Sequence, residues 1–139
     1  MSSERQESDK FTLVVRMGAS DAHYGGNVVA GARILELFGD AVTGLSAMDR
    51  GDEGLLASWE EVKFRKPVYP GDFIQVDARV EKRTKLRSFI KVTASRIVRG
   101  LSSRDSTVEK VDPPESVADA NGVIVIPYAQ ARGGAGNAK

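Results

Sequence analysis

Hydrophobic positions follow the period of a strand at the start of the chain. Phe11, Leu13 and Val15 are spaced by two, which predicts a strand with one buried face. Residues 18–27, GASDAHYGGN, carry no apolar period and end in Gly-Gly-Asn, so they predict a loop. The first structured segment is therefore expected to be a single strand that ends in an irregular connection.

From Val28 onward the apolar spacing changes to steps of three and four, which predicts a long helix with Gly26 or Asn27 as its N-cap. One apolar column consists of Val28, Ala32, Leu35, Phe38, Val42 and Leu45, and a second consists of Ile34, Leu37 and Ala41. Glycines inside this segment each cost about 1 kcal/mol of helix propensity relative to Ala. We therefore expect surrounding structure to hold the helix tightly.

Four strand-like runs follow the helix, at roughly 55–65, 73–83, 86–98 and 122–128, with turns predicted at 49–54 and 67–72. Segment 99–121 is polar and contains Pro113-Pro114, so it predicts a loop with at most a short strand near Thr107–Val111. A helix followed by consecutive strands indicates an α+β fold, an antiparallel sheet of about five strands with the helix on one face. Such a sheet leaves edges exposed, which favours a homodimer or a higher homo-oligomer.

The chain has 139 residues, which predicts one domain over 11–129, with a disordered segment at 1–10 and a flexible Gly-rich tail at 130–139. It has no cysteine and one histidine, so disulfide scaffolds, cysteine zinc sites, iron–sulfur clusters and multi-histidine metal cages are excluded within one chain. A net charge of +1 argues against nucleic acid or a membrane surface as partner. The polar first ten residues lack the core of a signal peptide, so a cytoplasmic location is expected.

Four short sequences carry a family resemblance: DAHYGGN at 21–27, GARI at 31–34, FGD at 38–40 and PVYPGDF at 67–73. Together they resemble the β-alanyl-CoA:ammonia lyase and 3-aminobutyryl-CoA ammonia lyase family, over roughly residues 11–128. The resemblance implies a hot-dog fold, in which a curved antiparallel sheet wraps one long central helix and sites form between two protomers. It implies addition or elimination of ammonia on a short-chain acyl-CoA, with CoA as part of the substrate and no other cofactor.

Two positions depart from the family pattern. Lys63 replaces the acidic residue that is usual just before Phe64, and Thr84-Lys85 replaces a Gly-Asn turn. These departures motivate one alternative, a non-catalytic acyl-CoA-binding dimer. A second alternative is an acyl-CoA thioesterase on the same fold. Phe38 falls near the helical carboxylate that would activate water for hydrolysis, unless a slip of one turn brings Glu36 or Asp40 there.

Removing a proton next to a thioester carbonyl creates an enolate oxygen that needs stabilisation. We expect the carbonyl to lie against N–H groups around Gly26–Val28, because Gly25 and Gly26 let it approach without a Cβ in the way and a helix N-terminus carries positive charge. The alternative is that these glycines only permit a tight turn.

His23 is the acid/base candidate, with Asp21 as its orienting partner, and the alternative is a His–Asp pair that pins the loop. Tyr24 is interpreted as a hydrogen-bond donor or pocket wall, and Asn27 as an N-cap or a contact to the substrate amide. For the carboxylate that attends the ammonium, Glu61 is the stronger candidate and Glu53 the weaker. Either glutamate is equally consistent with a solvated surface charge.

A basic cluster surrounds the predicted hairpin between the two long strands, including Arg83, Lys85 and Arg87. Such side chains at a cleft mouth can hold the phosphates of CoA, and Arg33 is a comparable candidate near the helix start. Charges at a hairpin tip also serve solubility alone. No residue set in the sequence points to a bound metal.

Overall fold

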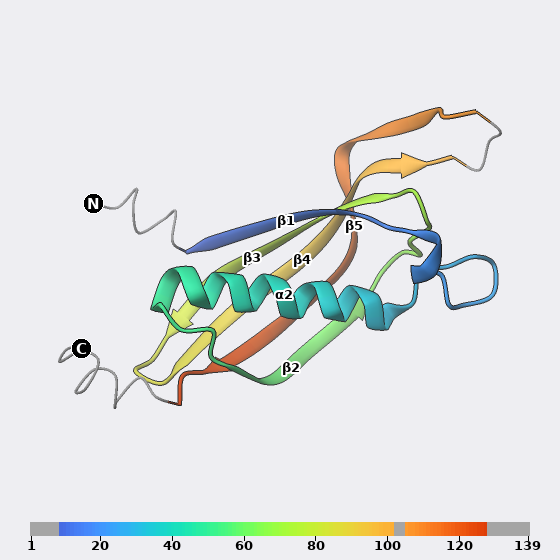
Figure 1. Ribbon diagram of the computed structural model, residues 1–139. Coiled ribbons are helices and arrows are strands. Elements are labelled where there is room, and N and C mark those ends of the chain that lie inside the picture. The colour runs from blue at the N-terminus through green and yellow to red at the C-terminus, as the bar shows by residue number, and fades with distance from the viewer. Residues whose placement is uncertain (1–8, 102–104, 128–139) are drawn as a thin grey trace.

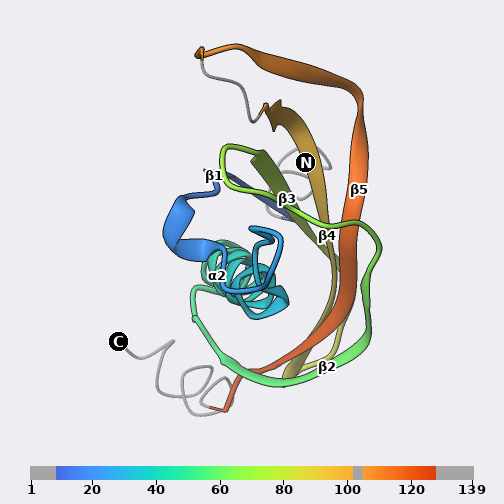
Figure 2. The same cartoon turned by 90° about the vertical axis from the view of Figure 1, so that its right-hand side faces the viewer.

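The computed structural model describes residues 9–101 and 105–127, in which a five-stranded antiparallel sheet curves around one long helix (Figure 1). The elements are β1 (Lys10–Arg16), the 3₁₀ turn η1 (Ala19–Asp21), α2 (Gly31–Arg50), β2 (Leu55–Phe64), β3 (Phe73–Arg83), β4 (Arg87–Gly100) and β5 (Val108–Val125). The strand order is β1-β3-β4-β5-β2, so β1 and β2 form the two edges. Figure 2 looks nearly along α2 and shows the sheet curling around one side of it.

The core lies between α2 and the concave face of the sheet. Buried and half-buried positions alternate over 73–78 of β3 and 88–96 of β4, as the period of two predicts for a strand with one inward face. The helix contributes the buried side chains Ile34, Leu37, Phe38, Ala41, Val42 and Leu45. The predicted α+β architecture with a hot-dog arrangement is confirmed, and the sheet does hold the glycine-containing helix.

The predicted N-terminal end of the helix is wrong. Helix α2 begins at Gly31 with Ala30 as N-cap, and Asn27 instead has a left-handed φ of 61°. An isolated bridge between Tyr24 and Val28 closes a tight turn there, and the Val29 N–H then donates to the Val68 carbonyl at 2.8 Å. Val28 fits the helical period because it faces the interior, although it belongs to an extended connection.

The predicted loop at 99–121 is also wrong, since β5 runs through most of it. Pro113 and Pro114 interrupt no ladder hydrogen bond because they lie in a bulge, where residues 111–114 face the single β4 residue between Arg96 and Val98. The residues that follow pair with β4 from Ser116 to Gly122, apart from a register shift at Val117. Gly122 is required there because the Trp59 ring lies against it, and a Cβ would be 2.8 Å from Trp59 Cζ3.

The expected terminal segments lie for the most part outside the described residues. Asp9 and Lys10 are exceptions that correct the prediction for 1–10, because Lys10 begins β1 and the Asp9 carboxylate pairs with Arg83. None of the helices in the described part of the chain combines the length and hydropathy of a membrane span. Within residues 9–101 and 105–127, no group of three or more acidic, histidine or cysteine side chains is placed to hold a metal ion.

A buried ion pair between Arg96 and Asp72 ties the connections together. Asp72 is completely buried and Arg96 is 4% exposed, and their side chains meet at 2.7 Å. The Asp72 carboxylate also accepts the N–H groups of Tyr69 and Gly100 at 2.9 Å each. Arg96 further donates to the Pro67 carbonyl and pairs with Glu115. One ion pair therefore joins the turn at 67–72 to β4 and to the bend of β5.

We expect Arg96→Met to lower the free energy of unfolding by about 3–5 kcal/mol, because it leaves the Asp72 charge buried without its partner while nearly keeping side-chain volume. Urea denaturation measures the loss. The matched control is Arg99→Met, since Arg99 also contacts Glu115 but its side chain is 36% exposed, and this change is expected to cost less than about 1 kcal/mol. Equal losses for the two variants would contradict the central role of the buried pair.

Candidate functional site

A cavity of about 320 Å³ opens at the N-terminal end of α2. Its wall is mainly apolar, with two cations on one side. The lining residues are Tyr24, Val28, Val29, Gly31, Ile34, Phe64, Arg65, Lys66, Pro67, Val68, Val117 and Ala118. Four segments therefore meet here: the loop before the helix, the start of α2, the end of β2 with the following turn, and the middle of β5.

Backbone hydrogen bonds hold the loop walls in place. The Ala30 N–H donates to the Asp21 carbonyl at 3.1 Å, and the 67–72 turn is joined to the loop through Val29. Within that turn Pro70 and Gly71 take the central positions, and the positive φ of Gly71, 92°, is the conformation that a type II turn requires of its third residue. The PVYPGD sequence thus forms a rigid turn that positions one wall of the cavity.

The start of α2 supplies free backbone donors at the cavity. Ala30 makes no side-chain cap, and within the described residues neither the Gly31 N–H nor the Ala32 N–H donates a hydrogen bond. The dipole of a helix concentrates partial positive charge at such N–H groups. Since the helix begins at Gly31, the positive end of its dipole lies at Gly31 and Ala32 rather than around Gly26–Val28, and of these residues Val28 and Gly31 line the cavity.

Arg65 and Lys66 place two cations beside the apolar wall. Lys66 Nζ lies 3.0 Å from Glu115 Oε2, and Lys66, together with Arg96, lowers the pKa of Glu115 to about 2. Arg65 Nε lies 2.5 Å from Asp119 Oδ2, and that hydrogen bond lowers the pKa of the Asp119 carboxyl. These pairs anchor the cavity rim to β5 and hold both cations at fixed places.

Of the residues predicted for the substrate, Tyr24 and Val28 line the cavity. Gly25, Gly26 and Asn27 form the exposed turn just beyond it and do not line it. Tyr24 is 56% exposed, so its ring forms an outer wall rather than part of the core. The positive φ of Gly26, 75°, agrees with the interpretation that this glycine permits the tight turn.

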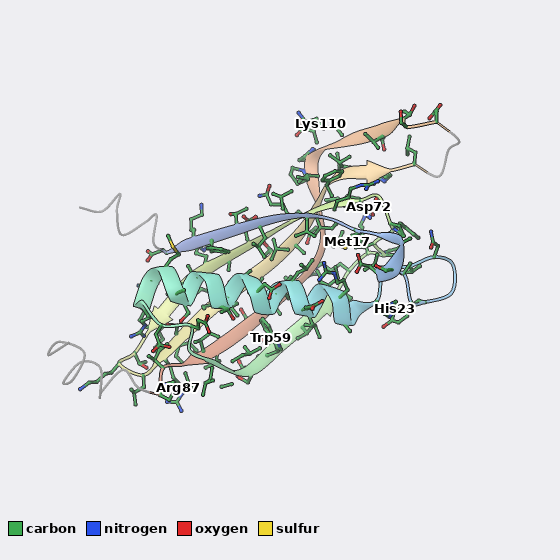
Figure 3. The ribbon with its side chains drawn as sticks, viewed as in Figure 1. Met17, His23, Trp59, Asp72, Arg87 and Lys110 are labelled. Carbon is green, nitrogen blue, oxygen red and sulfur yellow. The ribbon has the colours of Figure 1, made fainter. Side chains whose placement is uncertain are left out.

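The predicted pairing of His23 with Asp21 is wrong. Asp21 Oδ2 accepts the Gly18 N–H at 2.8 Å, and Asp21 Oδ1 lies 3.1 Å from Nε of Arg33. Exposed His23 instead lies with Nε2 2.7 Å from the Ser20 carbonyl, on the loop beyond the start of α2 (Figure 3). Asp21 and Arg33 therefore brace the loop against the helix, and neither lines the cavity.

Glu61 occupies an unusual backbone position on the edge strand β2. Its φ of 52° is left-handed, and it lies in a bulge where Glu61 and Val62 together face one residue of β5. The bulge shifts the alternation of the strand, so that Trp59 packs against Phe38 at a ring distance of 6.0 Å while Phe64 also reaches the helix, at Gly31. Glu61 itself is exposed and does not line the cavity of its own chain.

The remaining predicted residues lie at the far end of α2, about 30 Å away for a 20-residue helix. Glu53 is exposed in the connection after the helix. Arg83 pairs with Asp49 at 2.8 Å, and Lys85 and Arg87 lie on an exposed hairpin whose carbonyls accept hydrogen bonds from Arg50. Figure 3 shows Arg87 and His23 at opposite ends of the helix. Within one chain this basic cluster does not reach the cavity.

Most of the cavity wall could not be predicted from the sequence. The inward direction of Phe64 was not predictable, because the bulge at Glu61 breaks the alternation of the strand. Val117 and Ala118 fell in a segment interpreted as loop. Arg65 and Lys66 look like ordinary charges at a strand end, and no local signal distinguishes them.

A scan against protein-family models finds no match. Among curated proteins, 3-aminobutyryl-CoA ammonia lyase of Acetoanaerobium sticklandii is 41% identical over 119 residues, which cover 85% of this chain and 94% of that protein. Among solved structures, β-alanyl-CoA:ammonia lyase from Clostridium propionicum superposes with a TM-score of 0.80 at 31% identity, over 85% of both chains. A hexameric hotdog fold thioesterase of Campylobacter jejuni, 19% identical with a TM-score of 0.66 over 85% of this chain and 83% of that one, shares the fold.

Because Lys66 and Arg96 lower the pKa of Glu115 to about 2 from an ordinary value of 4.5, the Glu115 contacts stabilise the folded state fully above pH 4.5. That stabilisation is lost as the pH falls toward 2. We expect Glu115→Gln to lower the free energy of unfolding by about 1 kcal/mol at pH 7, the scale of a solvent-screened ion pair, and the difference to disappear near pH 2.

Urea denaturation of both proteins across this pH range makes the comparison. Glu109→Gln serves as control, since the Arg99–Glu109 pair lies near the surface with side chains 36% and 57% exposed, and it is expected to change stability by less than about 0.5 kcal/mol. A difference for Glu115→Gln that does not shrink between pH 5 and pH 2 would show that its charge is not what anchors Lys66.

Proposed function

The chain belongs to the family of ammonia lyases that act on CoA thioesters, and on that premise we propose that it removes ammonia from a short-chain β-aminoacyl-CoA or adds it to the matching enoyl-CoA. Its curated relative is named for 3-aminobutyryl-CoA, whose elimination product is crotonyl-CoA. The observation that carries the proposal is the apolar cavity at the start of α2, which Gly31 lines and where the Gly31 N–H donates no hydrogen bond within the described residues.

The first chemical step removes a proton from the carbon next to the thioester carbonyl. The electron pair that it leaves behind develops negative charge on the carbonyl oxygen, which is the main electrostatic cost of the reaction. We propose that the N–H groups of Gly31 and Ala32 stabilise this oxygen, since they carry the positive end of the helix dipole. The apolar side chains around them exclude water and strengthen that interaction.

The amino group of the substrate reacts as its protonated, ammonium form. In the second step its carbon–nitrogen bond breaks, a carbon–carbon double bond forms, and the nitrogen leaves as ammonia with the bond's electron pair. The base that took the proton returns it to the ammonia, so that ammonium is released and the base is restored. These steps need only acid–base groups and backbone donors, so the proposal includes no cofactor beyond the CoA of the substrate.

We propose Glu61 as the carboxylate of this cycle. A non-glycine residue in the left-handed region costs roughly 1–2 kcal/mol, and glycine is the residue that such a bulge favours. Retaining a charged glutamate there argues that its side chain, rather than its backbone, is what the position needs. His23 stays a second candidate for proton transfer, at the rim of the loop.

A second copy of the chain is proposed to complete the site, since Glu61 does not line the cavity of its own protomer. Strand β2 is a sheet edge, and it exposes the large apolar side chains Leu55, Leu56 and Phe64. An edge strand with such side chains favours pairing with another chain. A homodimer that covers this edge brings Glu61 of one protomer toward groups of the other.

Hydrolysis of the thioester is less well supported. Phe38, which falls near the position of a hydrolytic carboxylate, is completely buried in the core. Glu36 pairs with Arg33 at 2.8 Å on the exposed side of the helix, and Asp40 is exposed as well. Glu36 and Asp40 do not line the cavity of their own chain and Phe38 carries no carboxylate, so within one protomer α2 presents none of these candidates to the cavity.

The proposed reaction is tested by following crotonyl-CoA with and without ammonium while measuring free thiol. We expect ammonium-dependent loss of the enoyl absorbance with no release of thiol. Thiol release without an amine adduct would identify a thioesterase and overturn the proposal. Tight binding of CoA without turnover of any enoyl-CoA would instead identify a binding protein.

The role of Glu61 is tested by Glu61→Gly, which removes the carboxylate and relieves the backbone strain together. We expect the free energy of unfolding to rise by about 1 kcal/mol while kcat falls by roughly 10²–10⁴-fold. Glu61→Gln is expected to lose the same activity without gaining stability.

The neighbouring Glu60→Gln serves as a matched control and is expected to change neither property. If Glu61→Gly gains stability and keeps full activity, Glu61 is a strained surface charge and the base lies elsewhere. Urea denaturation and the crotonyl-CoA assay supply the two readouts.

A further inference from the structure

Gly31 and Phe64 touch across the wall of the cavity. A Cβ built on Gly31 would lie 3.1 Å from Phe64 Cζ and 3.2 Å from Cε1, closer than ordinary van der Waals contact. Both residues line the cavity, one from the start of α2 and the other from the end of β2. The tip of the ring therefore occupies the space that any side chain at position 31 would need.

Backbone conformation does not explain why position 31 is glycine. Gly31 has no positive φ, unlike Gly26 or Gly71, so its backbone conformation is open to other residues. Phe64 is 53% exposed, so its ring is not a buried part of the core either. Together, the missing side chain of Gly31 and the ring of Phe64 set how much free space remains at the cavity wall.

Gly31 and Phe64 lie where the acyl group of the substrate would bind, a placement that rests on the proposed function. A carbonyl oxygen bonded to the Gly31 N–H at about 2.9 Å has its Cα and Cβ within a few ångströms of the helix start. The substituent on Cβ then meets the ring of Phe64. We propose that Gly31 and Phe64 together set the size of the Cβ substituent that the site accepts, and so make it select short-chain substrates.

The test compares kcat/KM for crotonyl-CoA and for 2-hexenoyl-CoA, which differ by two methylene groups, in the ammonium-addition assay. Gly31→Ala adds a methyl group against the ring and is expected to lower the hexenoyl-to-crotonyl ratio at least ten-fold. Phe64→Leu opens the wall and is expected to raise the ratio at least ten-fold. One methylene in an apolar pocket typically changes discrimination by 10–200-fold.

Gly39→Ala is the matched control, because Gly39 lies in the same helix with no atom within 4 Å of its built Cβ. It makes the same chemical change at a position that does not line the cavity, and its ratio is expected to equal that of the unaltered chain. Far-UV circular dichroism and urea denaturation check that all three variants fold. A Gly31→Ala ratio equal to that of Gly39→Ala, or an unchanged ratio for Phe64→Leu, would overturn the inference.

A separate binding measurement keeps this inference distinct from the proposed reaction. Isothermal titration calorimetry measures the affinity for an acyl-CoA without requiring turnover. Butyryl-CoA and hexanoyl-CoA bind without reacting, and the ratio of their Kd values is expected to shift in the same directions as the kinetic ratio. If no enoyl-CoA is turned over but the Kd ratios shift, the reaction fails and the size selection stands. Unshifted Kd ratios would remove the size selection whether or not the chain is a lyase.

Discussion

The buried ion pair between Arg96 and Asp72 is the constraint on which the arrangement of the connections depends. Removing both charges from water costs several kcal/mol, and the cost is met only because almost every polar atom of the pair has a partner. Those partners belong to the 67–72 turn, to β4 and to the bend of β5. The pair therefore determines where three otherwise independent segments meet.

The segments that the Arg96–Asp72 pair joins also determine the shape of the cavity. The turn that Asp72 closes places Val68, which accepts the N–H of Val29 and so holds the loop before the helix. Glu115, which Arg96 also contacts, anchors Lys66, two residues before Val68. A rigid wall matters for the proposed chemistry, because backbone donors stabilise an enolate only when they are already in position.

Strain at Glu61 links the edge strand to the same site. The bulge there turns Phe64 toward Gly31 and, at the same time, leaves a carboxylate exposed on a strand with no neighbour on its outer side. The wall that limits the acyl group and the proposed base thus arise from one local distortion. In the cavity of a single chain, Phe64 is the residue that β2 contributes, and the turn that follows it adds Arg65, Lys66, Pro67 and Val68.

Local sequence determined the elements whose pattern is regular. The spacing of two in β3 and β4, the helical columns around Phe38, the turn at Pro70-Gly71 and the family motifs were enough to predict the fold, the order of elements and the CoA-thioester lyase family. Tertiary structure alone decided the rest. The helix begins at Gly31 rather than Val28, because the N–H groups of Val29 and Ala30 donate to carbonyls outside the helix. The Pro113–Gly122 region is a strand, because a bulge removes the prolines from the hydrogen-bond ladder. Tertiary structure also pairs the Asp21 carboxylate with Arg33 rather than with His23, and it packs the Phe64 ring against Gly31. Partners distant in sequence meet only once the sheet has curved around the helix.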